Sequence, residues 1–142
     1  MAKRGPKVAA GISYRPRISP AVFPGSRIKC VDNSGAHEVA MIGMIGGKSR
    51  HRRIVGAGVG DMILVSVKKG TPELRKQIMR AIVVRQKKPF RRLSGQWVQF
   101  EDNAVVIVTE DGSPKGTEVR GPIAREAAER WPRIAALATL IV

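Results

Sequence analysis

The side chains best suited to acid–base or nucleophilic chemistry in this chain are two histidines and one cysteine. His37 stands beside Glu38, and His51 lies inside the cationic run KSRHRR. Neither histidine has a cysteine, histidine or carboxylate at metal-ligand spacing, so the sequence predicts no metal site. We interpret both as polar surface residues or as contacts to nucleic acid. Cys30 falls in an alternating segment and is expected to be a small core residue.

Two further patterns could indicate catalysis, and both are weak. The acidic pairs at 101–102 and 110–111 are neighbours along expected strands, so their side chains point to opposite faces and make no acid–base couple. The glycine run at 56–60 lacks the Lys-Ser/Thr ending of a phosphate-binding loop, and a strand is expected after it. A hydrolase that uses His37 is therefore disfavoured. We expect no enzyme and no cofactor.

The charge of the chain is more informative than its catalytic side chains. Lys and Arg number 26 against 11 Asp and Glu, which leaves +15. Residues 1–100 hold 21 basic and 4 acidic groups (+17), whereas residues 101–142 hold 5 basic and 7 acidic groups (−2). Such a density of positive charge indicates a polyanionic partner, and nucleic acid fits best. An anionic membrane is the weaker interpretation, because no basic amphipathic helix is evident.

Three cationic segments are the candidate nucleic-acid contacts. The first is the N-terminal tail, the second is KSRHRR, and the third is RQKKPFRR, which leads to an expected turn at Ser94-Gly95. We also include the two lysines at the end of the strand expected over 61–69. The candidates are Lys3, Arg4, Lys7, Arg15, Arg17, Lys48, Arg50, His51, Arg52, Arg53, Lys68, Lys69, Arg85, Lys87, Lys88, Phe90, Arg91 and Arg92.

The scarcity of aromatic residues indicates which kind of nucleic acid is bound. Proteins that grip single strands stack bases on several aromatics, and this chain has only six. Phe100 and Trp97 are expected in the core, so Phe90 is the one aromatic that could be offered to a base. The contacts should go mainly to phosphates and 2′-hydroxyls of folded RNA. A free barrel-type single-strand binder or RNA chaperone is the alternative.

The hydrophobic pattern predicts mainly β structure in one domain. Residues 1–25 carry prolines at 6, 16, 20 and 24 and no acid, so we expect a tail that is ordered only against a partner. Short strands are expected over 27–31, 36–45, 61–69, 81–84, 96–100 and 104–109.

Gly121-Pro122 should start a helix over 123–130, supported by a Glu126–Arg130 pair, and a second short helix should cover 133–138. Five or six short strands followed by two small helices predict a small β-barrel over 26–116 with a helical extension over 117–142. The single cysteine fits a reducing compartment, and no apolar run is long enough to span a bilayer, so a cytoplasmic protein is expected.

Several motifs resemble one family, the universal large-subunit ribosomal protein fourteen in its archaeal and eukaryotic form. They are CVDNSGA at 30–36, AGVGDMILVSVKKGTPELRK at 57–76, FEDNAVVIV at 100–108, SPKGTEVRGP at 113–122 and RWPRIAALA at 130–138. AIVV at 81–84, followed after nine residues by Ser94-Gly95, matches the family's signature spacing.

The resemblance implies a closed five-stranded β-barrel with a C-terminal extension of small helices, in the large ribosomal subunit and on its interface side. The implied partners are large-subunit RNA, small-subunit RNA across an intersubunit bridge, neighbouring ribosomal proteins and an anti-association initiation factor. Carried over by motif, the factor-facing candidates are Thr117, Glu118 and Arg133.

Overall fold

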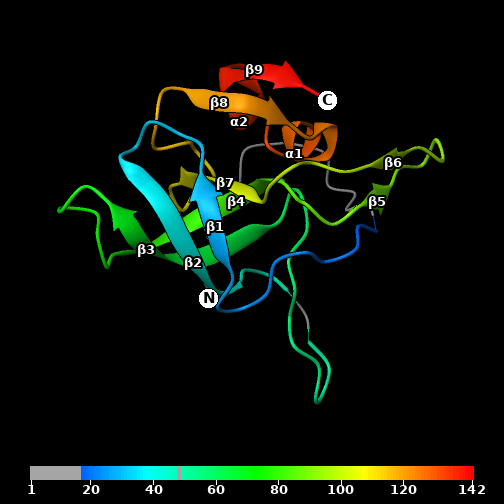
Figure 1. Ribbon diagram of the computed structural model, residues 1–142, viewed down its shortest axis with the longest axis horizontal. Helices are drawn as coiled ribbons and strands as arrows, with labels where there is room; N and C mark the ends of the chain where they lie inside the picture. The colour runs from blue at the N-terminus through cyan, green and yellow to red at the C-terminus, as the bar shows by residue number, and fades with distance from the viewer. Residues whose placement is uncertain (1–16, 48) are drawn as a thin grey trace, which may run out of the picture.

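The computed structural model describes residues 17–47 and 49–142, and these form mainly β structure with two short helices. Figure 1 shows a barrel with the C-terminal elements on one side and two segments that project away from it. The described residues include no helix with the length and apolar content of a membrane span.

The centre of the fold is a closed barrel of five strands, as the family resemblance implies. These are β1 (Arg27–Cys30), β2 (Ala36–Met44), β3 (Met62–Gly70), β4 (Ile78–Arg85) and β7 (Ala104–Val108). Neighbouring strands are antiparallel except for β1 and β7, which pair in parallel and close the barrel. A closed barrel leaves none of its strands with an unpaired edge.

Alternation along the strands fills the barrel interior. In β2 and β3 the inward residues Val39, Met41, Ile63, Val65 and Val67 are almost fully buried. Their neighbours in sequence face outward, which is the period of two expected for strands with one solvated face. The alternation predicted for both segments is confirmed.

β4 and β7 are apolar on both faces, because a second core covers the outside of the barrel there. Ile82 and Val106 lie in that second cluster, whereas Val83 and Val105 lie in the barrel interior. The second cluster includes Trp131 from the C-terminal part. This explains why the sequence from Ala104 to Val108 shows a continuous apolar run.

The C-terminal extension contains two helices and two strands. Its elements are β8 (Val119–Ile123), α1 (Arg125–Arg130), α2 (Pro132–Leu137) and β9 (Ala138–Ile141). β8 and β9 pair in parallel (Figure 1), so the prediction that Gly121-Pro122 starts a helix is wrong. Gly121 has φ +77°, a left-handed conformation that suits glycine and is not helical.

The ion pair predicted between Glu126 and Arg130 is also wrong. Glu126 pairs with Arg92 at 2.8 Å, and Arg130 pairs with Asp61 at 3.1 Å. Both side chains of α1 therefore attach the helix to other parts of the fold. Trp131, between the helices, donates from Nε1 to the carbonyl of Gly60 at 2.8 Å. A short helix needs such tertiary contacts, because its own hydrogen bonds are too few to sustain it.

The basic segment after β4 does not return as a barrel strand. The chain leaves the barrel after Arg85 and forms a separate two-stranded ribbon of β5 (Phe90–Arg91) and β6 (Trp97–Val98). The interpretation of residues 96–100 as a strand of the barrel is therefore wrong. Phe100 is buried in the second core, as predicted.

Candidate nucleic-acid interface

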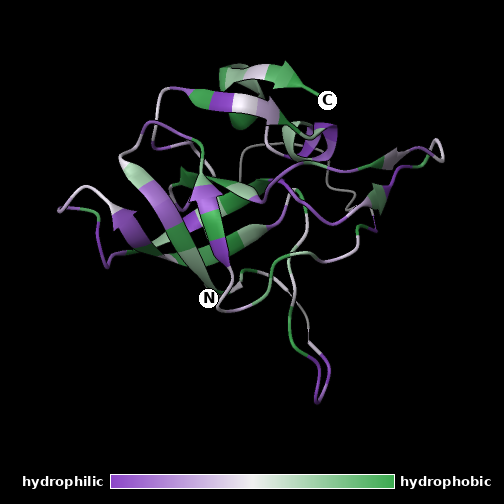
Figure 2. Cartoon of the chain, in the orientation of Figure 1, coloured by the Kyte–Doolittle hydropathy of each residue, from purple (hydrophilic) through white to green (hydrophobic). Residues whose placement is uncertain are grey.

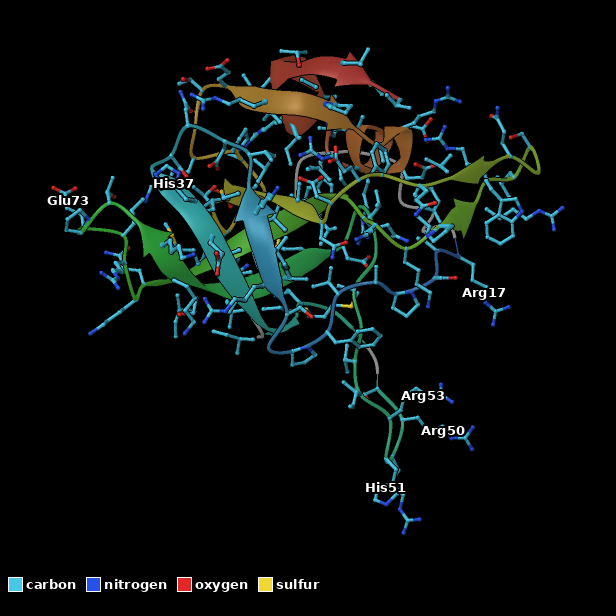
Figure 3. The ribbon with its side chains drawn as sticks, in the orientation of Figure 1. Arg17, His37, Arg50, His51, Arg53 and Glu73 are labelled. Atoms are coloured by element: carbon cyan, nitrogen blue, oxygen red, sulfur yellow. The ribbon has the colours of Figure 1, made fainter. Side chains whose placement is uncertain are left out.

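The most prominent cationic feature is a long arm between β2 and β3, residues 46–56, which we call the arginine loop. It projects well away from the barrel, and its tip is strongly hydrophilic (Figures 2 and 3). Arg50, His51, Arg52 and Arg53 are all exposed. Lys48 lies outside the described residues.

Backbone and side-chain hydrogen bonds shape the tip of the arginine loop. Arg53 donates its N–H to the carbonyl of Arg50 at 3.0 Å, and the Ser49 hydroxyl donates to the carbonyl of Arg53 at 2.6 Å. Arg52 takes a left-handed φ of 62°. No carboxylate pairs with a tip arginine among the ion pairs of the described residues. The tip can therefore offer its guanidinium groups to phosphates.

The β5–β6 ribbon is the second cationic projection. Lys87, Lys88 and Arg91 are exposed on the ribbon or just before it. The described part of the chain gives none of the three a carboxylate partner, although Lys88 Nζ lies 3.5 Å from the carbonyl oxygen of Pro20. These three cations agree with the prediction of an exposed basic tip.

The two aromatics of the ribbon have the reverse of their predicted places. Phe90 is 1% exposed and belongs to the second core, whereas Trp97 is 68% exposed. The ribbon register explains this, because Phe90 pairs with Val98 on the inner face while Arg91 pairs with Trp97 on the outer face. Phe90 is therefore corrected from a base contact to a core residue.

Arg85 is also a structural residue rather than a nucleic-acid contact. Its side chain is 10% exposed and forms a two-pronged ion pair with Asp102, with Nε to Oδ1 at 3.0 Å. Its Nη1 donates to the carbonyl of Pro122 at 3.0 Å. A guanidinium that is enclosed and satisfied in this way cannot reach a phosphate.

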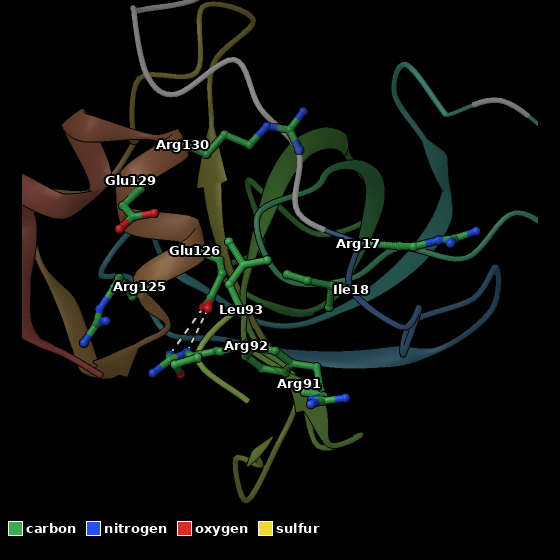
Figure 4. A pocket seen from close by; sticks show the side chains of 11 residues that line it. Arg17, Ile18, Arg91, Arg92, Leu93, Arg125, Glu126, Glu129 and Arg130 are labelled. Carbon is green, nitrogen blue, oxygen red and sulfur yellow. Dashed lines mark hydrogen bonds and ion pairs between the residues drawn. The ribbon is translucent and has the colours of Figure 1, made fainter. Parts of the chain in front are cut away.

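Arg92 is likewise occupied within the protein. It pairs with Glu126 at 2.8 Å (Figure 4). It also donates to the carbonyl of Val142 at 2.6 Å. Beside this pair lies a cavity of about 710 Å³, between the ribbon, α1 and the start of the described chain. Arg17, Arg91 and Glu129 are among the residues that line it.

Lys68 and Lys69 lie at the other end of β3 from the arginine loop. The strand rise of about 3.3 Å per residue separates them from its start by roughly 20 Å. Lys69 pairs with Glu38 at 3.1 Å, and Arg27 pairs with the same carboxylate at 2.7 Å. Hydrogen bonds from Arg27 and then Lys69 lower the pKa of Glu38. The predicted cations therefore do not converge on one site.

The N-terminal tail is described only from Arg17 onward, and Arg17 is exposed. Lys3, Arg4, Lys7 and Arg15 lie outside the described residues. Val22 is fully buried and pairs with Ala57. Residues 21–25 thus pack on the barrel, and the prediction that order begins only at residue 26 is wrong for them.

The side chains predicted to face a protein partner lie on the exposed surface of the C-terminal part. Thr117 and Glu118 donate their backbone N–H groups to Asn33 Oδ1 at 2.7 Å and 3.2 Å. Asn33 Nδ2 in turn donates to Thr117 Oγ1 at 2.8 Å. Arg133 instead contacts the hydroxyl of Ser113. No hydrogen bond of the described residues joins Arg133 to the other two.

Asn33 and Trp97 are the two site residues that sequence reasoning missed. Asn33 has the composition of a turn residue, and no local signal reveals a contact 84 residues away. For Trp97 a signal exists: a tight turn at 92–96 aligns Phe90 with Val98, which leaves Trp97 opposite Arg91.

The side chains of residues 17–47 and 49–142 form no arrangement suited to catalysis. The described residues hold no group of three or more possible metal ligands. Burial, and then the nearby charge of Asp32, raises the pKa of the Cys30 thiol to about 12. The thiol is therefore not an ionised nucleophile at neutral pH.

Comparison with known proteins agrees with the resemblance seen in the motifs. A family model described as ribosomal protein L14p/L23e matches residues 21–142. The large ribosomal subunit protein uL14 of Pyrobaculum islandicum is 60% identical, and that of Thermofilum pendens is 58% identical, each over the full length of both chains. The uL14 protein of Saccharolobus solfataricus is 58% identical over 92% of this chain and 95% of its own. This chain therefore belongs to the ribosomal protein L14p/L23e family.

Proposed function

We propose that this chain is a structural constituent of the large ribosomal subunit and binds large-subunit ribosomal RNA through the arginine loop and the β5–β6 ribbon. Membership of a structural, non-enzymatic ribosomal family supports the first part. The proposal of RNA binding rests on the arginine loop. Its three described arginines are exposed on a projecting arm and have no carboxylate partner among the described residues.

The two projections also support a bridging role. The arginine loop and the ribbon leave the barrel in different directions (Figures 1 and 3), so one chain can contact two separate RNA segments. We infer that one of these segments belongs to small-subunit RNA and that the chain lies on the interface side of the subunit. A cross-linking map of assembled particles tests this, since cross-links from both projections to large-subunit RNA alone would contradict it.

The C-terminal surface fits a protein partner better than RNA. Thr117 and Glu118 are exposed, and residues 101–142 carry a net charge of −2. The hydrogen bonds that Thr117 and Glu118 donate to Asn33 hold this segment against the barrel, so its exposed side chains form a preorganised surface. We infer that this surface, together with Arg133, contacts a neighbouring ribosomal protein or an anti-association factor.

The salt dependence of RNA binding tests the role of the arginine loop. Each phosphate contact contributes about 0.9 to the slope of log K against log salt on duplex nucleic acid. Changing Arg50, Arg52 and Arg53 together to Gln should therefore reduce the slope by about 2 to 3. An unchanged slope would exclude the arginine loop as a phosphate-binding element. Co-sedimentation with large subunits at low magnesium tests the assembly itself.

A further inference from the structure

The outer face of the β5–β6 ribbon exposes apolar surface that the fold does not need. Trp97 is 68% exposed and Leu93, in the turn, is 90% exposed. Tryptophan is enriched at interaction surfaces, and proteins that bind single-stranded nucleic acid use exposed aromatic rings as stacking platforms. The inner face of the ribbon anchors it to the rest of the fold, because Phe90 is buried in the second core.

The ribbon holds Trp97 in a defined orientation. Arg91 and Trp97 are directly opposed in the antiparallel pair, so their side chains share the outer face. Arg92 donates its N–H to the carbonyl of Gln96 at 2.9 Å and closes the turn. The only guanidinium groups over aromatic rings in the described residues are those of Arg92 and Arg130, and neither covers Trp97.

The charges around the ring identify its partner. Residues 86–100 contain four cations and no acid, and of these only Arg92 is neutralised by a carboxylate among the described residues. Trp97 is exposed opposite Arg91, on a segment that also carries the exposed Lys87 and Lys88. This is the composition of a site where a base stacks while its phosphates meet cations. An acidic protein surface could pair with the cations, but it would not require an exposed aromatic ring beside them.

We propose that Trp97 stacks on an unpaired base of RNA, with Arg91 on the flanking phosphate. This proposal rests on the proposed RNA-binding function and deepens it by naming a contact to a base. The ribbon then recognises a bulged or looped nucleotide, and the arginine loop makes the shape-dependent contacts to phosphates. A regular duplex lacks an accessible base face, so the ribbon should discriminate between the two forms.

The test compares a short RNA hairpin that carries one bulged adenosine with the fully paired hairpin of the same length. The full-length protein should prefer the bulged RNA by about tenfold in affinity at fixed salt, the size expected for one stacked base. Trp97→Leu should abolish that preference, because leucine keeps the apolar bulk and loses the aromatic plane. Trp97→Phe should keep most of it.

Fluorescence provides a second readout that does not depend on affinity. The other tryptophan, Trp131, is buried and donates its N–H to Gly60. Quenching by bulged RNA in the original protein, and its absence in Trp97→Phe, would assign the stacked ring to Trp97. Equal quenching in both proteins would contradict the proposal.

The outcomes separate this proposal from the function on which it rests. If Trp97→Leu binds both hairpins as the original does, while the arginine-loop triple variant binds weakly, the stacking proposal fails and RNA binding stands. If the triple variant also binds unchanged, the proposed use of the arginine loop fails independently. If Trp97→Leu lowers only the affinity for another subunit protein, the ring is a protein contact and the proposal is overturned.

Discussion

Replacing Arg85 with methionine should lower the free energy of unfolding without reducing the affinity for RNA. Methionine keeps much of the side-chain length and removes the guanidinium. Among the described residues, the change leaves Asp102, which is 24% exposed, with Lys29 at 3.8 Å as its one remaining ion-pair partner. It also removes the donor to the carbonyl of Pro122.

The magnitude follows from the burial of the pair. Removing one partner of a buried ion pair costs about 3–5 kcal/mol, and the partial exposure of Asp102 places this case near 3 kcal/mol. With a urea m-value of about 1.5 kcal/mol per M, the unfolding midpoint should fall by about 2 M. The fluorescence of buried Trp131 reports the transition.

Arg91→Met is the matched control, because Arg91 is exposed on the ribbon and no ion pair of the described residues includes it. It should change the free energy of unfolding by less than about 0.5 kcal/mol and should weaken RNA binding. The reasoning is refuted if Arg85→Met moves the midpoint by less than about 0.5 M. It is equally refuted if that variant loses as much RNA affinity as Arg91→Met.

Three further changes test other parts of the fold. The pKa of Cys30, raised to about 12 by burial and then by a nearby carboxylate, means that the unfolded thiol ionises first. The stabilising contribution of the protonated Cys30 thiol is complete below about pH 9 and is lost as pH rises through 12. The rate of alkylation of the folded protein should therefore keep rising with pH and show no plateau near pH 9. Gly70→Ala should lower the free energy of unfolding by about 1–3 kcal/mol, because the new Cβ would lie 2.7 Å from the backbone oxygen of Gly35, just before β2. Gly43→Ala meets nothing within 4 Å and is the control in the same urea melt. Asn33→Ala should speed amide exchange at Thr117 about fivefold by removing its 2.7 Å hydrogen bond, and unchanged exchange would show that other contacts hold the segment.

The barrel could be predicted because its information is local. Val39 and Met41 alternate with outward-facing neighbours, and the apolar run over 104–108 requires burial on both faces. Each pattern lies within one strand and reflects the period of the backbone itself. These patterns made a small β-barrel predictable, whereas its closure by five strands followed from the resemblance of the motifs to a known family.

The roles of the individual cations were less predictable, because they depend on which carboxylates the fold brings near. The carboxylate that neutralises Arg85 lies 17 positions away along the chain, and the carboxylate that neutralises Arg92 lies 34 positions away. By contrast, the arginine loop has no carboxylate close in sequence or among its described contacts, so its exposure was predicted correctly. The β8–β9 pair escaped prediction for a similar reason, since parallel strands joined by two helices have no local turn signal.

The parallel joint between β1 and β7 also determines when the barrel can form during synthesis. β1 ends at residue 30 and its partner is complete only at residue 108, and the Asp32 carboxylate accepts the N–H of Ile107 at 2.9 Å across the same gap. Every contact of this joint closes a loop of more than seventy residues, a topology that slows folding. The first strand made must therefore wait for the last barrel strand, with its β7-facing edge unpaired. A chain released before residue 108 cannot close the barrel, however many of its other strands have paired.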